Sequence, residues 1–309
     1  MSERVRVEVE GRQLSLSNLD KVMYPQTGFT KGEVIDYYTR IAPVLLPHLS
    51  GRPLTVKRYP NGVDAPFFYE KNAPKSTPDW VPTVRLPVPG STKDRETIDY
   101  LLVQELATLV WLANQAALEL HVPQWRITDP RAQPPVPATD TIVFDLDPGS
   151  PASVTECARV ALLLRDKLRA DGLRPRAKTS GAKGIQVSAA IAVGPGLADT
   201  SGYAHKLAIE LCGEHPELIV AKMAKELRRG KVLIDWSQNN PAKTTVAPYS
   251  LRARKTPTVS TPLRWSELAS GAPLSFTSDE VLHRVDERGD LYADTLRPPA
   301  QAPSFGRSE

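Results

Sequence analysis

The stretch Thr141-Ile-Val-Phe-Asp-Leu-Asp-Pro-Gly149 has the pattern of a strand that ends in a turn. Side chains alternate between the two faces of a strand, so the apolar residues Ile142 to Leu146 at every second position share one face. Asp145 and Asp147 then share the other face. The stretch therefore predicts a strand that is buried on one side and presents two neighbouring carboxylates on the other.

Two carboxylates in this arrangement can hold a divalent cation, because Mg²⁺ and Mn²⁺ prefer oxygen ligands. A second short apolar run, Val232-Leu-Ile-Asp-Trp236, carries one more acidic residue, Asp235. We expect Asp145, Asp147 and Asp235 to meet at one metal site. The D-x-D motif alone is weak support, since it also occurs in glycosyltransferases and calcium loops.

Length and composition limit the function classes. A chain of 309 residues can bury one large core or two closely packed lobes. No apolar run reaches the roughly 18–20 residues that a membrane-spanning helix needs, and the charged, alternating N-terminus does not resemble a signal peptide. Two cysteines in helical patterns indicate no disulfide framework. We expect a reduced, cytoplasmic protein without a membrane partner, and the net charge of +4 mildly favours a polyanionic ligand.

The first long helix has a clear start. Thr30 and Glu33 form a capping-box pattern before an apolar stripe. Lys31 lies in the first turn, where we expect unpaired backbone N–H groups, and Lys21 precedes it in a loop. The two lysines could bind a phosphate; the alternative is that both are solvated surface residues.

Further helices and strands follow from periodicity and capping signals. We expect a helix over 103–120 followed by His121, which is more often structural than catalytic, and a helix from Ser150 to Gly172. Strands are expected at 176–178 and 185–191, and helices at 200–213 and 219–229. This mixture predicts an α+β or α/β fold with a central sheet.

An aromatic run lies in the loop expected over 62–74. Phe67-Phe-Tyr-Glu-Lys71 places three rings in a polar, proline-bounded segment, and exposed rings stack on nucleic-acid bases. Alternatively, the rings cover the edge of the core. The strand expected over 53–58 directs Lys57 away from its apolar neighbours.

The turn Ser180-Gly-Ala-Lys-Gly184 lies between the two acidic strands. Its glycines allow a close approach of an anion to the backbone, and Ser180 and Lys183 add a hydroxyl and a cation. It is not a Walker A loop, which has four residues before Gly-Lys-Ser/Thr. Its place nevertheless makes a nucleoside triphosphate a reasonable ligand, with further contacts possible from Lys57, Arg228, Gln238 and Arg252.

Taken together, these motifs resemble a known family: the bacterial primase-polymerases of the archaeo-eukaryotic primase superfamily, typified by the polymerase domain of DNA ligase D. The resemblance covers about residues 10–295, and its motifs occur in order. They are Leu16-Ser-Asn-Leu-Asp-Lys-Val22, Thr30-Lys-Gly32, Arg58-Tyr-Pro-Asn-Gly62, Asp145-Leu-Asp147, Ser180-Gly-Ala-Lys-Gly184, Asp235-Trp-Ser-Gln-Asn239 and Ala247-Pro-Tyr-Ser-Leu-Arg252.

The resemblance implies an α+β fold, with an RRM-like catalytic sheet flanked by helices and an N-terminal α/β lobe. It implies two Mn²⁺ or Mg²⁺ ions, with Mn²⁺ favoured, and often ribonucleotides as substrates. The implied roles are metal binding and catalysis by Asp145, Asp147 and Asp235; nucleotide binding by Lys57, Ser180, Lys183, Gln186, Arg228, Gln238 and Arg252; binding of a DNA 5′-phosphate by Lys21 and Lys31; and template stacking by Phe68 or Tyr69.

Two features depart from the family pattern. Gln186 occupies the position where the family usually has a histidine, and an amide can donate a hydrogen bond but cannot carry a charge or shuttle a proton. In addition, the chain has the extent of the polymerase domain alone, so it resembles a free-standing member that works with a separate ATP-dependent ligase C.

We therefore expect one catalytic unit over 1–292, a loosely ordered tail over 293–309, and a nucleotidyltransferase that fills short gaps in duplex DNA during excision repair in the bacterial nucleoid. The alternatives are an end-joining polymerase acting with Ku and a ligase, a non-catalytic protein that binds DNA ends or gaps, and, less favoured, a two-metal nuclease.

Overall fold

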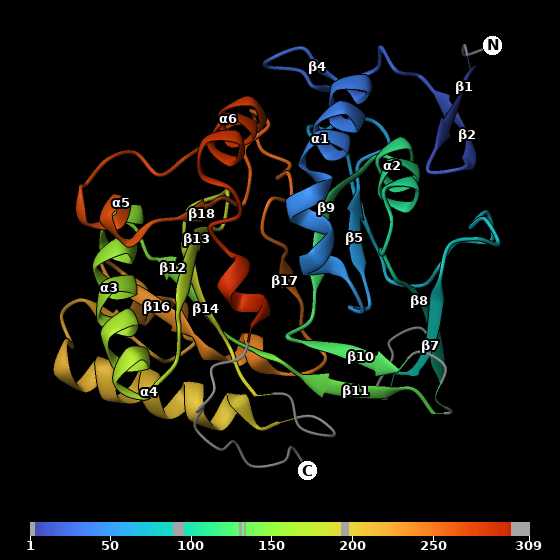
Figure 1. The fold of residues 1–309 in the computed structure, drawn as a ribbon. Helices are drawn as coiled ribbons and strands as arrows, with labels where there is room; N and C mark the ends of the chain where they lie inside the picture. The colour runs from blue at the N-terminus through green and yellow to red at the C-terminus, as the bar shows by residue number, and fades with distance from the viewer. Residues whose placement is uncertain (1–3, 89–95, 130–131, 133, 193–197, 298–309) are drawn as a thin grey trace.

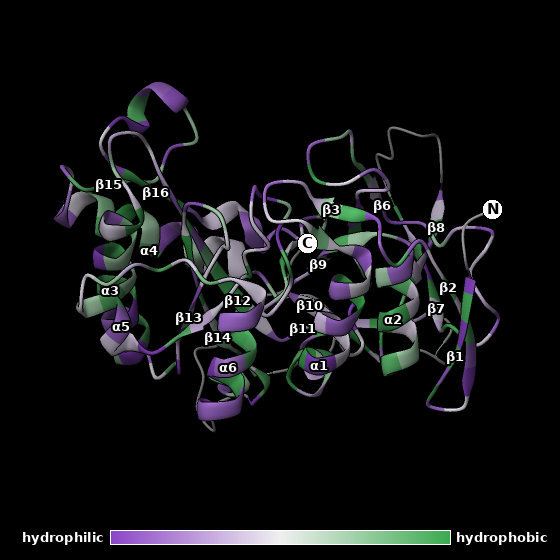
Figure 2. Ribbon diagram, turned by 90° about the horizontal axis from the view of Figure 1, so that it is seen from above, coloured by the Kyte–Doolittle hydropathy of each residue, from purple (hydrophilic) through white to green (hydrophobic). Residues whose placement is uncertain are grey.

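The computed structural model describes residues 4–88, 96–129, 132, 134–192 and 198–297. Its helices and strands form two sheet-based lobes that lie side by side (Figure 1). Seen from above, α3, α4 and α5 lie at one side of the molecule and α1 and α2 at the other (Figure 2). In the part of the chain that is described, no helix is long and apolar enough to cross a bilayer.

The catalytic lobe, as the acidic motifs define it, contains a six-stranded sheet with the order β15-β16-β12-β14-β13-β18. Its strands and covering helices are β12 (Thr141–Pro148), α3 (Val154–Ala170), β13 (Arg176–Thr179), β14 (Ile185–Ala190), α4 (Thr200–Glu214), β15 (Ile219–Val220), β16 (Val232–Asp235), β18 (Pro262–Leu263) and α5 (Trp265–Ala269). All pairings in this sheet are antiparallel except that of β15 with β16.

The alternation predicted for 141–149 determines which face of this sheet is covered. Ile142, Phe144 and Leu146 are fully buried and pack with apolar residues of α3 and α4. Asp145 and Asp147 alternate with these residues along the strand and therefore project from the opposite face. The apolar face anchors β12, and the acidic face is left available for a site.

The N-terminal lobe contains the four-stranded sheet β17-β9-β5-β6, covered by α1 and α2 (Figure 1). Its members are α1 (Lys31–Leu49), β5 (Thr55–Arg58), β6 (Phe68–Glu70), α2 (Leu106–Asn114), β9 (Ala117–Val122) and β17 (Thr245–Val246). The smaller elements are β1 (Arg4–Val9), β2 (Arg12–Ser17), β3 (Val22–Tyr24), β4 (Phe29–Thr30), β7 (Thr83–Pro87), β8 (Thr97–Leu101), β10 (Trp125–Asp129) and β11 (Val136–Thr139).

The C-terminal half of the chain returns to this lobe and ties the two lobes together. β17 follows the catalytic strand β16 in sequence but pairs with β9. Tyr38 of α1 donates its hydroxyl hydrogen to the carbonyl of Leu118, and Ser250 accepts a hydrogen bond from the backbone of Leu120. Arg52 and Asp140 form a buried ion pair at 2.8 Å at the start of β12.

Several sequence predictions are corrected by these assignments. The helix expected over 103–120 ends at Asn114, and Ala116 takes a left-handed conformation before β9 begins. Residues 117–120 are all buried, Glu119 included, and so short a stretch of mostly apolar residues does not distinguish a strand from a helix. His121 therefore lies within a strand rather than after a helix.

The helix expected over 219–229 is also wrong. Ile219 and Val220 form β15, which completes the edge of the catalytic sheet, and only 225–228 form a short 3-10 helix, η1 (Lys225–Arg228). The loop expected over 62–74 contains the strand β6, which pairs with β5. In each case pairing with a distant strand outweighs local propensity.

The end of the described chain is structured. α6 (Ser278–Arg288) is followed by the 3-10 helix η3 (Ala293–Leu296), in which Thr295 is buried and Asp294 pairs with Arg176. The chain is thus still ordered at 293, where we expected a tail to begin. The rest of that predicted tail, 298–309, lies outside the described residues.

The start of α3 differs from the prediction by three residues. Ser153, rather than Ser150, is the N-cap: its hydroxyl oxygen accepts a hydrogen bond from the N–H of Thr155, and Glu156 completes a capping box. Ser153→Ala should lower the free energy of unfolding by about 1 kcal/mol. Ser150→Ala is the matched control and should change it by less than about 0.5 kcal/mol. Urea denaturation of both variants tests this, and equal effects would contradict the assignment.

Candidate active site

The three predicted aspartates lie on one face of two paired strands. Asp145 and Asp147 are two residues apart on β12, and Asp235 at the end of β16 is directly opposite Asp145. Asp145 is half-buried, Asp147 is exposed, and Asp235 is 9% exposed. The sheet register therefore brings together three carboxylates that are up to 90 residues apart in the sequence.

Burial and mutual repulsion make the ionised state of Asp145 and Asp147 costly. Burial, followed by the charge of Asp147, raises the pKa of Asp145 to about 7. Burial, followed by the charge of Asp235, also raises the pKa of Asp147, whereas the charge of Arg228 lowers it. A divalent cation would relieve this repulsion, and oxygen-only ligands suit Mg²⁺ or Mn²⁺.

The carboxylate of Asp235 is engaged within its own turn. It accepts hydrogen bonds from the backbone N–H of Ser237 at 3.0 Å and from the amide of Gln238 at 2.8 Å. Within the described ranges, no group of three or more His, Cys, Asp or Glu side chains is already arranged to hold a metal ion. The chemistry of the donor set fits a divalent cation, and the three carboxylates lie on the same face of the sheet.

The Ser180–Gly184 turn connects β13 to β14 beside the acidic row. The hydroxyl oxygen of Ser180 accepts hydrogen bonds from the N–H groups of Ala182 (3.3 Å) and Gly184 (3.1 Å). Gly184 is required by close packing, because a Cβ atom there would lie 2.1 Å from the carbonyl oxygen of Leu146. The turn is therefore held against the strand that carries the aspartates, and Lys183 at its tip is exposed.

An open pocket of about 270 Å³ lies between this turn, the acidic strand and the N-terminal lobe. Seven of the predicted site residues line it: Asp145, Asp147, Ser180, Lys183, Gln186, Gln238 and Arg252. Its lining includes four residues to which the sequence analysis gave no site role: His121, Thr244, Thr245 and Arg254.

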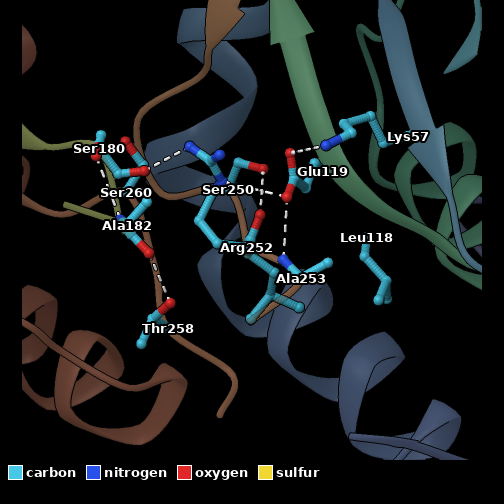
Figure 3. A network of polar contacts seen from close by, with 12 residues as sticks. Lys57, Leu118, Glu119, Ser180, Ala182, Ser250, Arg252, Ala253, Thr258 and Ser260 are labelled. Carbon is cyan, nitrogen blue, oxygen red and sulfur yellow. Dashed lines mark hydrogen bonds and ion pairs between the residues drawn. The ribbon is translucent and has the colours of Figure 1, made fainter. Parts of the chain in front are cut away.

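A network centred on Glu119 connects the two lobes at this pocket (Figure 3). Glu119 lies on β9 and is 2% exposed. One carboxylate oxygen contacts the backbone N–H of Ala253 at 3.1 Å and Nε of Arg252 at 3.3 Å. The other contacts Nε2 of His121 at 2.9 Å and Nζ of Lys57 at 3.5 Å.

Arg252 extends this network to the Ser180–Gly184 turn. Its guanidinium donates a hydrogen bond to the carbonyl of Ser180, and Lys57 approaches Glu119 from the side opposite to Arg252 (Figure 3). Lys57 is therefore bound to Glu119, and it lies outside the residues that line the pocket. Arg228, in η1, likewise lies outside the lining and donates to the carbonyl of Met223.

The two predicted phosphate-binding lysines lie close together. Lys21 donates to the side-chain oxygen of Asn61 at 3.0 Å, and Lys31, 5% exposed, donates to the carbonyl of Ser17. Burial, followed by the charge of Lys21, lowers the pKa of Lys31 to about 8. A phosphate dianion would relieve this repulsion between two cations.

The N–H groups at the start of α1 are not unpaired, contrary to the sequence prediction. Those of Lys31 and Gly32 donate to the carbonyls of Lys21 and Leu19, both at 2.8 Å. That of Glu33 donates to the hydroxyl of Thr30. The preceding loop folds back onto the helix start, so only the lysine side chains remain to meet an anion.

The aromatic run divides between two faces of the small sheet, since neighbouring strand residues point in opposite directions. Tyr69 is 59% exposed and shares a face with Lys57 and His121, whose ring centroid lies 6.5 Å from its own. Phe68, 43% exposed, packs against Arg58 on the other face. Tyr69 is thus the ring of the predicted pair on the pocket side.

Comparison with known proteins agrees with this geometry. Residues 30–292 match the family described as LigD, primase-polymerase domain. The chain belongs to this family. The match confirms the predicted resemblance, the α+β primase-like fold and the enzyme class, a DNA-directed nucleotidyltransferase.

Solved and curated relatives are similar over most of the chain. The structure of the polymerase domain from Mycobacterium tuberculosis ligase D in complex with DNA has 41% sequence identity and a TM-score of 0.86, covering 94% of this chain and 99% of that one. The multifunctional non-homologous end joining protein LigD of Mycolicibacterium smegmatis is 43% identical over 281 residues, which are 91% of this chain and 36% of that protein.

The bifunctional non-homologous end joining protein LigD of Bacillus subtilis is 33% identical over 293 residues, 94% of this chain and 45% of that protein. The chain therefore spans less than half the length of these two curated relatives.

Two residues of this LigD-type primase-polymerase domain were missed for an identifiable reason. Placing a helix over 103–120 hid the strand alternation of Glu119 and His121, which puts both on the same face of β9. Because the carboxylate of Glu119 can only accept, Nε2 of His121 donates to it. Burial lowers the pKa of His121, so the neutral ring keeps Nδ1 as an acceptor.

Glu119 should make the stability of the domain depend on pH. Burial alone would raise its pKa, but the hydrogen bond from His121 and the charges of Arg252 and Lys57 outweigh burial and lower it to about 2. A carboxylate with a lowered pKa stabilises the fold above its unfolded-state pKa, and this contribution is lost as the pH falls towards the folded-state value.

We expect Glu119→Gln to lower the free energy of unfolding by about 3 kcal/mol at pH 6–7, and the difference from wild type to shrink between about pH 4.5 and pH 2. Urea denaturation at several pH values measures this. Glu217→Gln, at an exposed carboxylate, is the control and should stay within about 0.5 kcal/mol of wild type. A difference that is independent of pH would contradict the role of the Glu119 charge.

Proposed function

We propose that the domain adds nucleotides, templated by DNA, to a 3′-hydroxyl at short gaps in duplex DNA. The observation that carries this is the placement of Asp145, Asp147 and Asp235 in one row beside a pocket that Ser180, Lys183 and Arg252 line or border. A row of carboxylates next to basic and hydroxyl donors suits a triphosphate together with the cations that accompany it. In this proposed reaction the cations are two Mn²⁺ or Mg²⁺ ions, with Mn²⁺ preferred, and ribonucleotides are the favoured substrates.

When bound, divalent cations would lower the pKa of the primer hydroxyl and neutralise charge on the triphosphate and the departing pyrophosphate. In the proposal the aspartates hold these cations, and Ser180, Lys183 and Arg252 orient the triphosphate. Gln238 donates a hydrogen bond to Asp235 and also lines the pocket, so it could contact the triphosphate as well as the aspartate. Arg228 contributes through its charge next to Asp147.

Lys21 and Lys31 support a second contact, with the 5′-phosphate on the far side of a gap. Two neighbouring lysines, one buried and carrying a lowered pKa, form a site that a dianion would stabilise. Tyr69, exposed on the same side as His121, would stack on a template base. These contacts recognise phosphate and base faces rather than sequence, so binding should weaken with salt.

End joining is the second candidate, and the names of the M. smegmatis and B. subtilis relatives favour it. In either role the proposed place of action is the bacterial chromosome, and a DNA ligase must seal the product. Gap filling would pair the domain with a separate ATP-dependent ligase, and end joining would add Ku.

Replacing the acidic pair should abolish synthesis. Asp145→Ala/Asp147→Ala is expected to lower the rate of nucleotide incorporation with Mn²⁺ at least about a thousandfold, equivalent to about 4 kcal/mol of barrier. Extension of a labelled primer on a gapped duplex measures this, and Asp166→Ala, at an exposed aspartate on α3, is the control. Equal incorporation by the double variant and wild type would refute the catalytic assignment and leave the non-catalytic DNA-binding alternative.

The lysine pair should determine gap preference. We expect wild type to extend a gap with a downstream 5′-phosphate about tenfold more efficiently than the same gap with a 5′-hydroxyl, and Lys21→Ala/Lys31→Ala to remove the difference. The preference should also decline above about pH 8, because Lys31 of the free protein then loses its proton. Lys167→Ala, on α3, is the control. A wild-type protein that extends blunt or overhanging ends as well as the phosphorylated gap would favour end joining.

A further inference from the structure

One row of polar side chains crosses four strands on the pocket face of the catalytic sheet. Lys178 on β13 lies opposite Gln186 on β14, Gln186 lies opposite Asp145 on β12, and Asp145 lies opposite Asp235 on β16. Directly opposed residues in antiparallel strands project to the same face with Cβ atoms about 5 Å apart. A cation, an amide and two carboxylates are therefore consecutive neighbours.

Lys178 is a buried amine at one end of this row; burial lowers its pKa to about 7, and the charge of Asp145 opposes this shift. Its side chain is in contact with three acceptors, the side-chain oxygen of Gln186, the carbonyl of Val246 at 2.9 Å and the hydroxyl of Ser260 at 2.8 Å. An ammonium has three protons, so its hydrogen-bonding capacity is filled. Lys178 is 3% exposed, so all of its contacts are with the fold itself.

These contacts leave the amide of Gln186 one orientation. Lysine only donates, so the atom of Gln186 that it contacts is the carbonyl oxygen Oε1. The other end of the amide, Nε2, can only donate, and Gln186 forms a side-chain hydrogen bond with Asp145. A carboxylate accepts, so the row is consistent in direction from Lys178 through Gln186 to Asp145.

We propose that Lys178 and Gln186 are positioning residues for the acidic site: Lys178 orients the amide of Gln186, and the amide orients the carboxylate of Asp145. This rests on the proposed function and changes the role expected for Gln186, from a nucleotide contact to a support of a metal-binding aspartate. An amide held in this way has a fixed polarity and cannot lose or gain a proton, unlike the histidine that the family usually has there.

A double-mutant cycle tests the row. Lys178→Met and Gln186→Met each remove one link at similar side-chain length. The readout is the dissociation constant of Mn²⁺ for the free protein, measured by electron paramagnetic resonance without DNA or nucleotide. Loss of a residue that orients a metal ligand weakens metal binding about tenfold or more. We expect each single variant to raise the dissociation constant about tenfold, and the double variant to be no weaker than the weaker single variant.

Kinetics on a gapped duplex separate positioning from nucleotide contact. Both single variants should lower kcat at fixed, subsaturating Mn²⁺ while KM for the nucleotide stays within about twofold of wild type. Lys167→Met, which removes a cation of α3 that pairs with Glu210 and Glu214 of α4, is the matched control and should leave both constants and Mn²⁺ binding unchanged. Should Lys178→Met not fold, Ser260→Ala removes one of the three acceptors of Lys178 and should raise the Mn²⁺ dissociation constant about threefold.

Two outcomes would overturn this inference: effects of Lys178→Met and Gln186→Met that multiply in the double variant, or a Gln186→Met protein with normal Mn²⁺ binding and a raised KM for nucleotide. Neither outcome would contradict the proposed function. That proposal fails if the wild-type protein incorporates no nucleotide. The Mn²⁺ titration needs no turnover, so the two failures are distinguishable.

Discussion

Repulsion between carboxylates on one face of β12 and β16 is the constraint on which the rest of the site depends. The strands cannot move apart to relieve it, because the opposite face of β12 is packed into the core by Phe144 and its apolar neighbours. The negative charge of the carboxylates must therefore be compensated by nearby positive charge and not by movement of the strands. Burial and mutual repulsion raise the pKa of Asp145 to about 7, and this cost of ionisation is what a cation offsets.

Two basic side chains of the protein supply part of the compensating positive charge. Arg228 acts on Asp147 through its charge. Lys178 acts on Asp145 through space and, in our proposal, through the amide of Gln186. Both side chains lie outside the residues that line the pocket, so they can stabilise the acidic row without occupying the pocket.

The pocket itself is a product of both lobes. Arg252 donates to the Ser180–Gly184 turn while Glu119, on a strand of the N-terminal lobe, contacts Nε of the same guanidinium. The same carboxylate orients His121 and engages Lys57. A buried carboxylate that is shared by three basic side chains couples the geometry of the pocket to the packing of β9 against the C-terminal half of the chain. The contacts of Glu119 therefore link the two lobes at the pocket.

The sequence by itself determined the acidic strand, the glycine-containing turn, the capping box of the first helix and the family. These are local patterns: alternation with period two, a close approach that excludes a Cβ atom, and caps that lie within three residues. They were sufficient to name seven residues that line the pocket. The order of the motifs along the chain was specific enough to identify the fold class without coordinates.

Only the tertiary structure decided how the strands pair, and through pairing which charges meet. Residues 117–120 and 219–220 look helical or ambiguous in sequence, because such short, mostly apolar stretches fit the period of a helix or of a strand. Their partners β5 and β16 make them strands. The strand conformation of β9, which carries Glu119 and His121, places both residues at the pocket. Likewise, register alone aligns Lys178, Gln186, Asp145 and Asp235 in one row, since no spacing along the chain encodes which residues face each other across a sheet.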